Sequence, residues 1–167
     1  MGWTYSNQWD SQKQVEKAVI DSMNHGGYSV IDKSSRWGEL YLAVETPRNN
    51  NVSIAVVLIR KSDGEYGYKI MDESMGPYYY NCPDRILKLS TDSYETSIKW
   101  RAECVSVRGH RRLQKHLLSK LTHGDCINTS FGIVRFIRMF NKSGSVFVGE
   151  NLTKNQVFRY PANCILP

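Results

Sequence analysis

Residues Leu40–Ile70 read LYLAVETPRNNNVSIAVVLIRKSDGEYGYKI, and this stretch contains three strand patterns separated by two turns. Leu40–Val44 and Tyr66–Ile70 follow the two-residue period of a half-buried strand. Val52–Arg60 is nearly continuous in apolar residues, which is typical of a central strand buried on both faces. The segments between them are rich in Asn, Asp and Gly, which favour turns. The stretch therefore predicts an antiparallel meander.

A helix is predicted ahead of the meander, over about Ser11–Asn24. Ser11 is followed three residues later by Gln14, which is a capping-box pattern. Apolar residues then recur at helical spacing until Gly26, a typical helix end. Tyr28–Asp32 adds a short strand. One helix followed by antiparallel strands indicates the α+β class, with the N-terminal helix packed on the sheet.

Helices and then short strands are predicted beyond the meander. Pro83 suits the first turn of a short helix, and residues 93–121 predict two helices or one helix kinked at Gly109. Four β-like runs follow, at residues 126–130, 133–140, 145–148 and 156–160. They predict a small β-rich, barrel-like C-terminal part after the helical middle segment. We expect an α+β domain over residues 1–121, with a small β-rich segment over 122–167 packed on it.

Composition and local patterns exclude several protein classes. The chain has 167 residues, 41% of them hydrophobic, which excludes collagen-like, coiled-coil and wholly disordered proteins. The longest apolar run, Ile54–Ile59, has six residues, against the ~20 that a membrane-spanning helix needs. The opening MGWTYSNQWD lacks the charged and apolar regions of a secretory signal, so we expect a cytoplasmic location in a bacterial host cell. The four cysteines form no C-x-x-C pair, so we expect reduced thiols.

Charge is distributed unevenly along the chain. The net charge is +6, but residues 1–98 carry 10 basic and 13 acidic side chains, whereas residues 99–167 carry 12 basic and 3 acidic ones. Such asymmetry predicts a surface on the second part that faces a polyanion. Nucleic acid is the common polyanion in cytoplasm, an acidic protein groove is the alternative, and a merely solvated face is the third interpretation.

The basic residues between positions 99 and 138 are the predicted binding surface. Arg108, Arg111, Arg112 and Lys115 recur at three- and four-residue spacing, so they share one side of a helix, which we expect to lie opposite the leucines. Arginine favours bidentate contacts with phosphate or carboxylate groups. The full predicted set for nucleic acid or a partner is Lys99, Arg101, Arg108, Arg111, Arg112, Lys115, His116, Lys120, Arg135 and Arg138.

Three consecutive tyrosines, Tyr78, Tyr79 and Tyr80, follow a Gly-Pro turn. Aromatic side chains beside cations stack on bases or anchor protein interfaces. The alternative is that they cover the sheet and brace the turn, and the neighbouring prolines favour this interpretation.

Catalytic motifs are absent from the sequence. It contains no Walker loop, H-E-x-x-H, G-x-S-x-G or dinucleotide fingerprint. Asp72 and Glu73 are candidate metal-binding carboxylates of a nuclease, with His110 or His116 as the base, but an exposed loop end is the favoured interpretation of the two acids. No catalytic residue, cofactor or metal is predicted.

Three segments together suggest a family. The opening MGWT, the stretch GYKIMDESMGPYYYNCPDRILKL at residues 67–89 and IKWRAEC at residues 98–104 resemble the pattern of a family of small uncharacterised proteins carried by plasmids and phages, chiefly of Firmicutes. The resemblance implies a mobile genetic element as the setting and brings no catalytic residues with it. Small basic proteins in that setting often counter host defence or handle the element's own nucleic acid.

Charge and setting together lead to three hypotheses. The first is a non-enzymatic protein that inhibits a host nucleic-acid-targeting defence system by stoichiometric binding through a basic face, in the manner of an anti-CRISPR protein. The second is a DNA- or RNA-binding accessory protein of a phage or plasmid. The third is a small nuclease that acts on guide or host RNA. The expected partner is accordingly a host defence nucleoprotein or nucleic acid, and no membrane.

Overall fold

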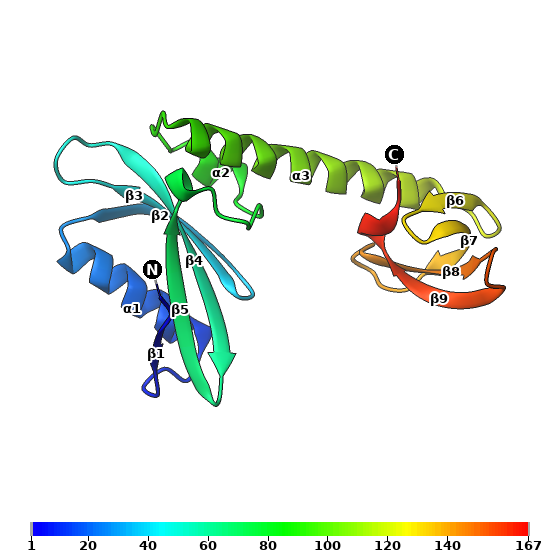
Figure 1. The fold of residues 1–167 in the computed structure, drawn as a ribbon, viewed down its shortest axis with the longest axis horizontal. Helices are drawn as coiled ribbons and strands as arrows, with labels where there is room; N and C mark the ends of the chain where they lie inside the picture. The colour runs from blue at the N-terminus through cyan, green and yellow to red at the C-terminus, as the bar shows by residue number, and fades with distance from the viewer. Residues whose placement is uncertain (1, 167) are drawn as a thin grey trace. The chain divides into compact units, whose positions relative to one another are not determined.

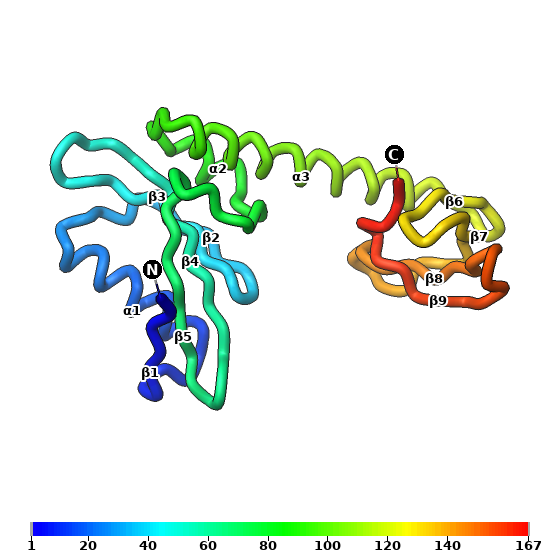
Figure 2. The backbone as a smooth tube through the Cα atoms, in the orientation of Figure 1, coloured from blue at the N-terminus to red at the C-terminus, as the bar shows by residue number. Residues whose placement is uncertain are grey.

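A computed structural model describes residues 2–166 (Figures 1 and 2). The chain divides into two compact units, the N-terminal unit Met1–Ser106 and the C-terminal unit Val107–Pro167. The boundary lies within helix α3 (Glu95–Lys120), whereas the sequence suggested a boundary after residue 121. The fold class is α+β, as predicted. None of the helices among the described residues is long and apolar enough to cross a membrane.

The N-terminal unit contains the predicted antiparallel meander. Its strands are β2 (Ser29–Arg36), β3 (Glu39–Glu45), β4 (Val52–Ser62) and β5 (Glu65–Asp72), paired in sequence order. A fifth strand, β1 (Thr4–Ser6), was not predicted and pairs with β5, giving the order β1-β5-β4-β3-β2. Tyr5 therefore belongs to the sheet, and the ring of Trp3 stacks on that of Tyr5 at 6.0 Å between centroids.

Helices cover both faces of this sheet. Helix α1 (Gln12–His25) begins with the predicted capping box and packs Val15 and Val19 on one face. Helix α2 (Asp84–Leu87) and the first part of α3 cover the other face, which holds Trp100 and Cys104. Strand β4 lies between the layers, because Ile54, Val56 and Leu58 join one cluster while Ala55, Val57 and Ile59 join the other. The continuous apolar run predicted as a central strand is confirmed.

Helix α3 is one continuous helix that passes through Gly109. The chain therefore does not form two helices here, and the helix is not interrupted at that glycine. Its buried side differs from the one that the apolar spacing suggested. Ile98, Val105, Leu113 and Leu117 are exposed. Among the three leucines of α3, only Leu118 is buried. The leucines therefore do not define a buried side opposite the basic residues.

The C-terminal unit forms a second antiparallel sheet. Strands β6 (Cys126–Thr129), β7 (Gly132–Met139), β8 (Val146–Asn151) and β9 (Gln156–Pro161) pair in sequence order and match the four predicted runs. The short 3-10 helix η2 (Ala162–Cys164) follows, and an isolated bridge joins Ile165 to Thr129. Strands β6 and β9 are the edges of the described sheet, so the expected barrel-like closure is not confirmed.

One face of this sheet is the core of the C-terminal unit. Phe136, Phe147 and Tyr160 pack there with Val134 and with Leu118 from α3.

All four cysteines of the chain are free thiols, and Cys82, Cys104 and Cys164 are buried while Cys126 is exposed.

Candidate functional site

The C-terminal unit holds most of the excess positive charge. It carries ten Lys and Arg residues against two Asp and Glu, whereas the N-terminal unit carries twelve against fourteen. The second half of α3 and the four-stranded sheet present this charge on two separate surfaces.

The first surface is the helix set, which comprises Arg108, Arg111, Arg112, Lys115, His116 and Lys120 on α3. All are exposed except Arg108, which is half-buried. Gln114 and Leu118, which lie among these residues in the sequence, are buried. The Gln114 amide lies 3.4 Å from the carbonyl oxygen of Ile165. Since residues three and four apart on a helix are neighbours, the basic residues form adjacent rows beside the buried seam.

The second surface is the sheet set, which comprises Arg135, Arg138 and Arg159. Strand pairing places Arg135 opposite Glu150, and Arg138 and Arg159 on either side of Val148. Residues opposite one another share a face, so the three arginines lie on the face away from Phe147 and Leu118. The predicted basic residues of the C-terminal unit therefore lie on two surfaces, because the helix set and the sheet set lie on opposite sides of the sheet.

Contacts within the sheet set reduce its free charge. An oxygen of Glu150 lies 3.2 Å from the Arg135 guanidinium, and the Arg159 guanidinium lies 4.0 Å from the centre of the Phe140 ring. Arg159 was not among the predicted residues. The turn at residues 152–155 was the available signal, because the register that it sets pairs Arg159 with Val148, on the face away from the core.

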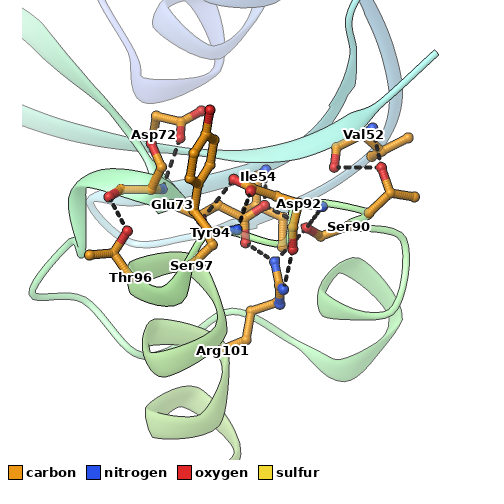
Figure 3. Close-up of polar contacts among 12 residues, drawn as sticks. Val52, Ile54, Asp72, Glu73, Ser90, Asp92, Tyr94, Thr96, Ser97 and Arg101 are labelled. Atoms are coloured by element: carbon orange, nitrogen blue, oxygen red, sulfur yellow. Dashed lines mark hydrogen bonds and ion pairs between the residues drawn. The ribbon is translucent and has the colours of Figure 1, made fainter. Parts of the chain in front are cut away.

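Two predicted residues, Lys99 and Arg101, belong to the N-terminal unit and have local partners. Lys99 forms an exposed ion pair with Glu95 at 2.6 Å. Arg101 is largely buried, and its guanidinium donates to Glu73, to the Ser90 hydroxyl and to the carbonyl of Asp92, each at 2.6 Å (Figure 3). Arg101 therefore has a structural role, and its place in the binding surface stays a prediction.

Glu73 is the centre of that buried network. Its carboxylate accepts hydrogen bonds from the backbone N–H of Ile54 at 2.9 Å and from the Ser90 hydroxyl at 2.6 Å, besides the Arg101 contact. Burial raises the pKa of Glu73, and its contacts with Ser90 and Arg101 oppose that rise. The expectation that Asp72 and Glu73 form an exposed loop end is wrong for Glu73, which is fully buried.

Asp72 also has a structural role, because its side chain accepts a hydrogen bond from the backbone N–H of Ser74 at 2.8 Å. The same holds for Asp92, which accepts from the N–H of Tyr94 at 2.9 Å and from the Ser97 hydroxyl at 2.7 Å just before α3 (Figure 3). Across residues 2–166, no three His, Cys, Asp or Glu side chains are grouped so that they would hold a metal ion.

The tyrosine run is divided between packing and solvent. Tyr80 packs against the buried cluster of the N-terminal unit, and the carbonyl of Tyr79 accepts a hydrogen bond from the Trp100 ring at 3.0 Å. Tyr78 is 85% exposed. Tyr80 therefore packs on the core, the backbone of Tyr79 braces the turn, and Tyr78 has the most exposed ring of the three, with Tyr79 at 39%.

Exposed aromatic residues in the C-terminal unit were missed by the sequence analysis. Phe131 and Phe158 are 58% and 40% exposed, and both lie near the buried ring of Tyr160. The sequence analysis assigned no role to either residue, and the register and the turns place both at the surface. The unit thus combines accessible cations with accessible aromatic rings, which is the combination that binds single-stranded nucleic acid.

The chain matches no protein-family model, no curated protein and no solved structure.

Proposed function

We propose that this chain is a non-enzymatic protein that binds nucleic acid stoichiometrically through the C-terminal unit, and thereby inhibits a host nucleic-acid-targeting defence complex such as a CRISPR effector. The observation that carries the binding step is the helix set, exposed except for Arg108, within a unit that has ten basic and two acidic residues. Each phosphate that such a surface neutralises releases counterions, so affinity falls steeply as salt rises.

The inhibitory role rests on the resemblance to plasmid and phage proteins. An inhibitor of this kind occupies a surface that normally holds nucleic acid, or the guide RNA itself, and competition of this kind needs no catalytic group. A second role, as an accessory protein that binds the element's own DNA or RNA, is supported by the same basic surface. The two roles differ in whether a host complex is needed.

The first experiment measures binding of the full chain to labelled single- and double-stranded RNA and DNA at about 50 and 200 mM salt. The test variant is Arg112→Gln/Lys115→Gln/Lys120→Gln in the helix set. The matched control is Lys13→Gln/Lys17→Gln/Lys33→Gln, which removes three exposed lysines from the N-terminal unit. We expect the helix-set variant to reduce the salt slope by about 2–3, since each phosphate contact contributes about 0.7–0.9.

The control variant should keep the slope of the original protein. An equal loss in both variants, or no binding of any strand at the lower salt, would contradict the proposed binding. Gel analysis of the same samples detects cleaved strands, which would replace a binding role with a nuclease role.

The second experiment separates the two roles. A defence nuclease loaded with its guide and target is titrated with the protein, and inhibition should be complete near one protein per complex. Tight binding of free nucleic acid with no inhibition would assign the accessory role instead.

A further inference from the structure

A cavity of about 240 Å³ lies on the C-terminal unit, lined chiefly by Phe131, Phe158 and Tyr160, with Asn151, Lys154 and Arg159. Phe131 comes from the β6–β7 turn, Lys154 from the β8–β9 turn, and Phe158 and Tyr160 from β9. The Phe131 and Phe158 rings lie 5.9 and 6.1 Å from that of Tyr160, tilted and edge-on respectively. Three aromatic rings therefore converge on one small opening.

Two buried polar side chains hold the Phe131 turn in place. The Thr129 hydroxyl accepts from the N–H of Phe131 at 3.1 Å and donates to the carbonyl of Gly132 at 2.7 Å. The Asn151 amide donates to the carbonyl of Phe131 at 2.9 Å, and both side chains are at most 4% exposed. An exposed phenylalanine is thus mounted on a rigid turn, as in a site that is organised before its ligand arrives.

Asn151 also fixes the cationic side of the cavity. Its side-chain oxygen accepts from the N–H groups of Thr153 and Lys154, each at 3.0 Å. One buried amide therefore positions the turn that carries Phe131 and the turn that carries Lys154.

Tyr160 supplies an independent sign of a ligand site. Its side chain is 4% exposed, and its hydroxyl is buried with no hydrogen-bond partner among residues 2–166. A buried hydroxyl without a partner costs about 1–3 kcal/mol. Functional sites are one of the places where proteins keep a buried polar group without a hydrogen-bond partner.

We propose that this cavity takes one unpaired nucleobase of a single-stranded nucleic acid, stacked against Phe131 and Phe158, with Lys154 beside the strand's phosphates. The inference rests on the proposed nucleic-acid binding and specifies the kind of strand that is bound. The cavity is smaller than the ~300–1,000 Å³ of sites for drug-sized ligands, so its size suits a single ring system. Every base offers a flat face, so stacking here is tolerant of sequence.

The test compares a single-stranded oligonucleotide with an abasic strand of the same length and charge, each binding to the full chain. The variants are Phe131→Leu, which keeps apolar bulk but removes the ring, and Phe131→Trp, which keeps a ring. Trp37→Ala is the distant control, because Trp37 is 93% exposed and lies in the N-terminal unit. We expect the protein to prefer the base-bearing strand by about 5- to 150-fold, which is the range that stacking of one base supplies.

Phe131→Leu should lose this preference and keep the affinity for the abasic strand, while Phe131→Trp and Trp37→Ala keep both. Equal affinity of the original protein for the two strands would overturn the base site and leave the proposed function standing. A preference that survives in Phe131→Leu would also overturn it. Failure to bind either single strand would overturn the base site, and it would overturn the proposed function as well only if duplex RNA and DNA also fail to bind.

Discussion

The two units use charged side chains in different ways. In the N-terminal unit, Arg101 is buried against Glu73, and Arg85 contacts Asp32 and the carbonyl of Lys33. In the C-terminal unit, most basic side chains are exposed and outnumber acids ten to two. Arg101 and Arg85 therefore join elements of the first unit, whereas the basic side chains of the second unit greatly outnumber its acidic ones. A basic residue therefore indicates a binding surface only where its own unit offers it no acidic partner.

Replacing Arg101 with Met should have the largest effect on stability. The change leaves Glu73 buried without its cation, and the expected loss is about 3–5 kcal/mol in the free energy of unfolding at neutral pH. Denaturant titration followed by tryptophan fluorescence measures it, because all four tryptophans lie in the N-terminal unit.

The loss should shrink as pH falls. Burial raises the pKa of Glu73 above its value in the unfolded chain, and removal of Arg101 raises it further. A carboxyl of this kind binds protons more tightly in the folded state, so its penalty is full above the folded-state pKa and fades toward the unfolded-state pKa. A loss that is the same at neutral and acid pH would contradict this account of the network.

Gly149→Ala should have the next largest effect and should be confined to the other unit. A Cβ at Gly149 would lie 2.3 Å from Val134 Cγ1 and 3.1 Å from the carbonyl oxygen of Arg135. Overpacking of this degree costs about 1–3 kcal/mol. Hydrogen exchange should become faster in β7–β9, while the tryptophan-detected unfolding of the N-terminal unit stays unchanged. A change in the tryptophan signal would show that the two units do not unfold separately.

Neutralising the sheet set should affect binding less than neutralising the helix set. In Arg135→Gln/Arg138→Gln/Arg159→Gln, one lost cation is already paired with Glu150 and another lies over Phe140. We therefore expect the salt slope to fall by about 1, against the larger fall for three helix-set changes. A larger fall for the sheet-set variant would place the principal contact on the outer sheet face.

Tyr160→Phe should have the smallest effect on stability. Unlike Arg101→Met and Gly149→Ala, it should not destabilise the protein. It removes a buried hydroxyl without a partner, so the free energy of unfolding should stay the same or rise by about 1 kcal/mol. Hydrogen exchange of β8 and β9 measures the change. A clear decrease would mean that the hydroxyl has a partner, such as a bound water, in solution.

Local patterns predicted much of the fold. The capping box of α1 and the two-residue period of β3 and β5 act over neighbouring residues, so they are visible in sequence. Strand β1 was missed because three residues carry no period and its partner β5 is distant in the chain. The buried side of α3 was misjudged because the helix has apolar residues on more than one side, and tertiary packing selects Trp100, Cys104 and Leu118.

The candidate site was predicted in composition and less well in arrangement. The charge excess of the second part is a property of the sequence itself. The separation of the helix set from the sheet set depends on strand register, where one residue of shift moves a side chain to the other face. The burial of Arg101 depends on its ion pair with Glu73, which is remote in sequence. The exposure of Phe131 depends on its turn, which hydrogen bonds with Thr129 and Asn151 hold in place, and the sequence alone does not show these contacts.

The pairing of β1 with β5 has a consequence for the order of folding. Strands β2–β5 form hairpins between sequence neighbours, whereas Thr4 pairs with Tyr68 and closes a loop that contains α1 and strands β2–β4. Local contacts form early and distant ones are delayed by loop closure, so we expect β1 to dock last. Trp3 lies against Arg60, with 3.9 Å between the guanidinium carbon and the ring centre. Its fluorescence would then report the final step, in which the first strand of the chain completes a sheet that the rest has already built.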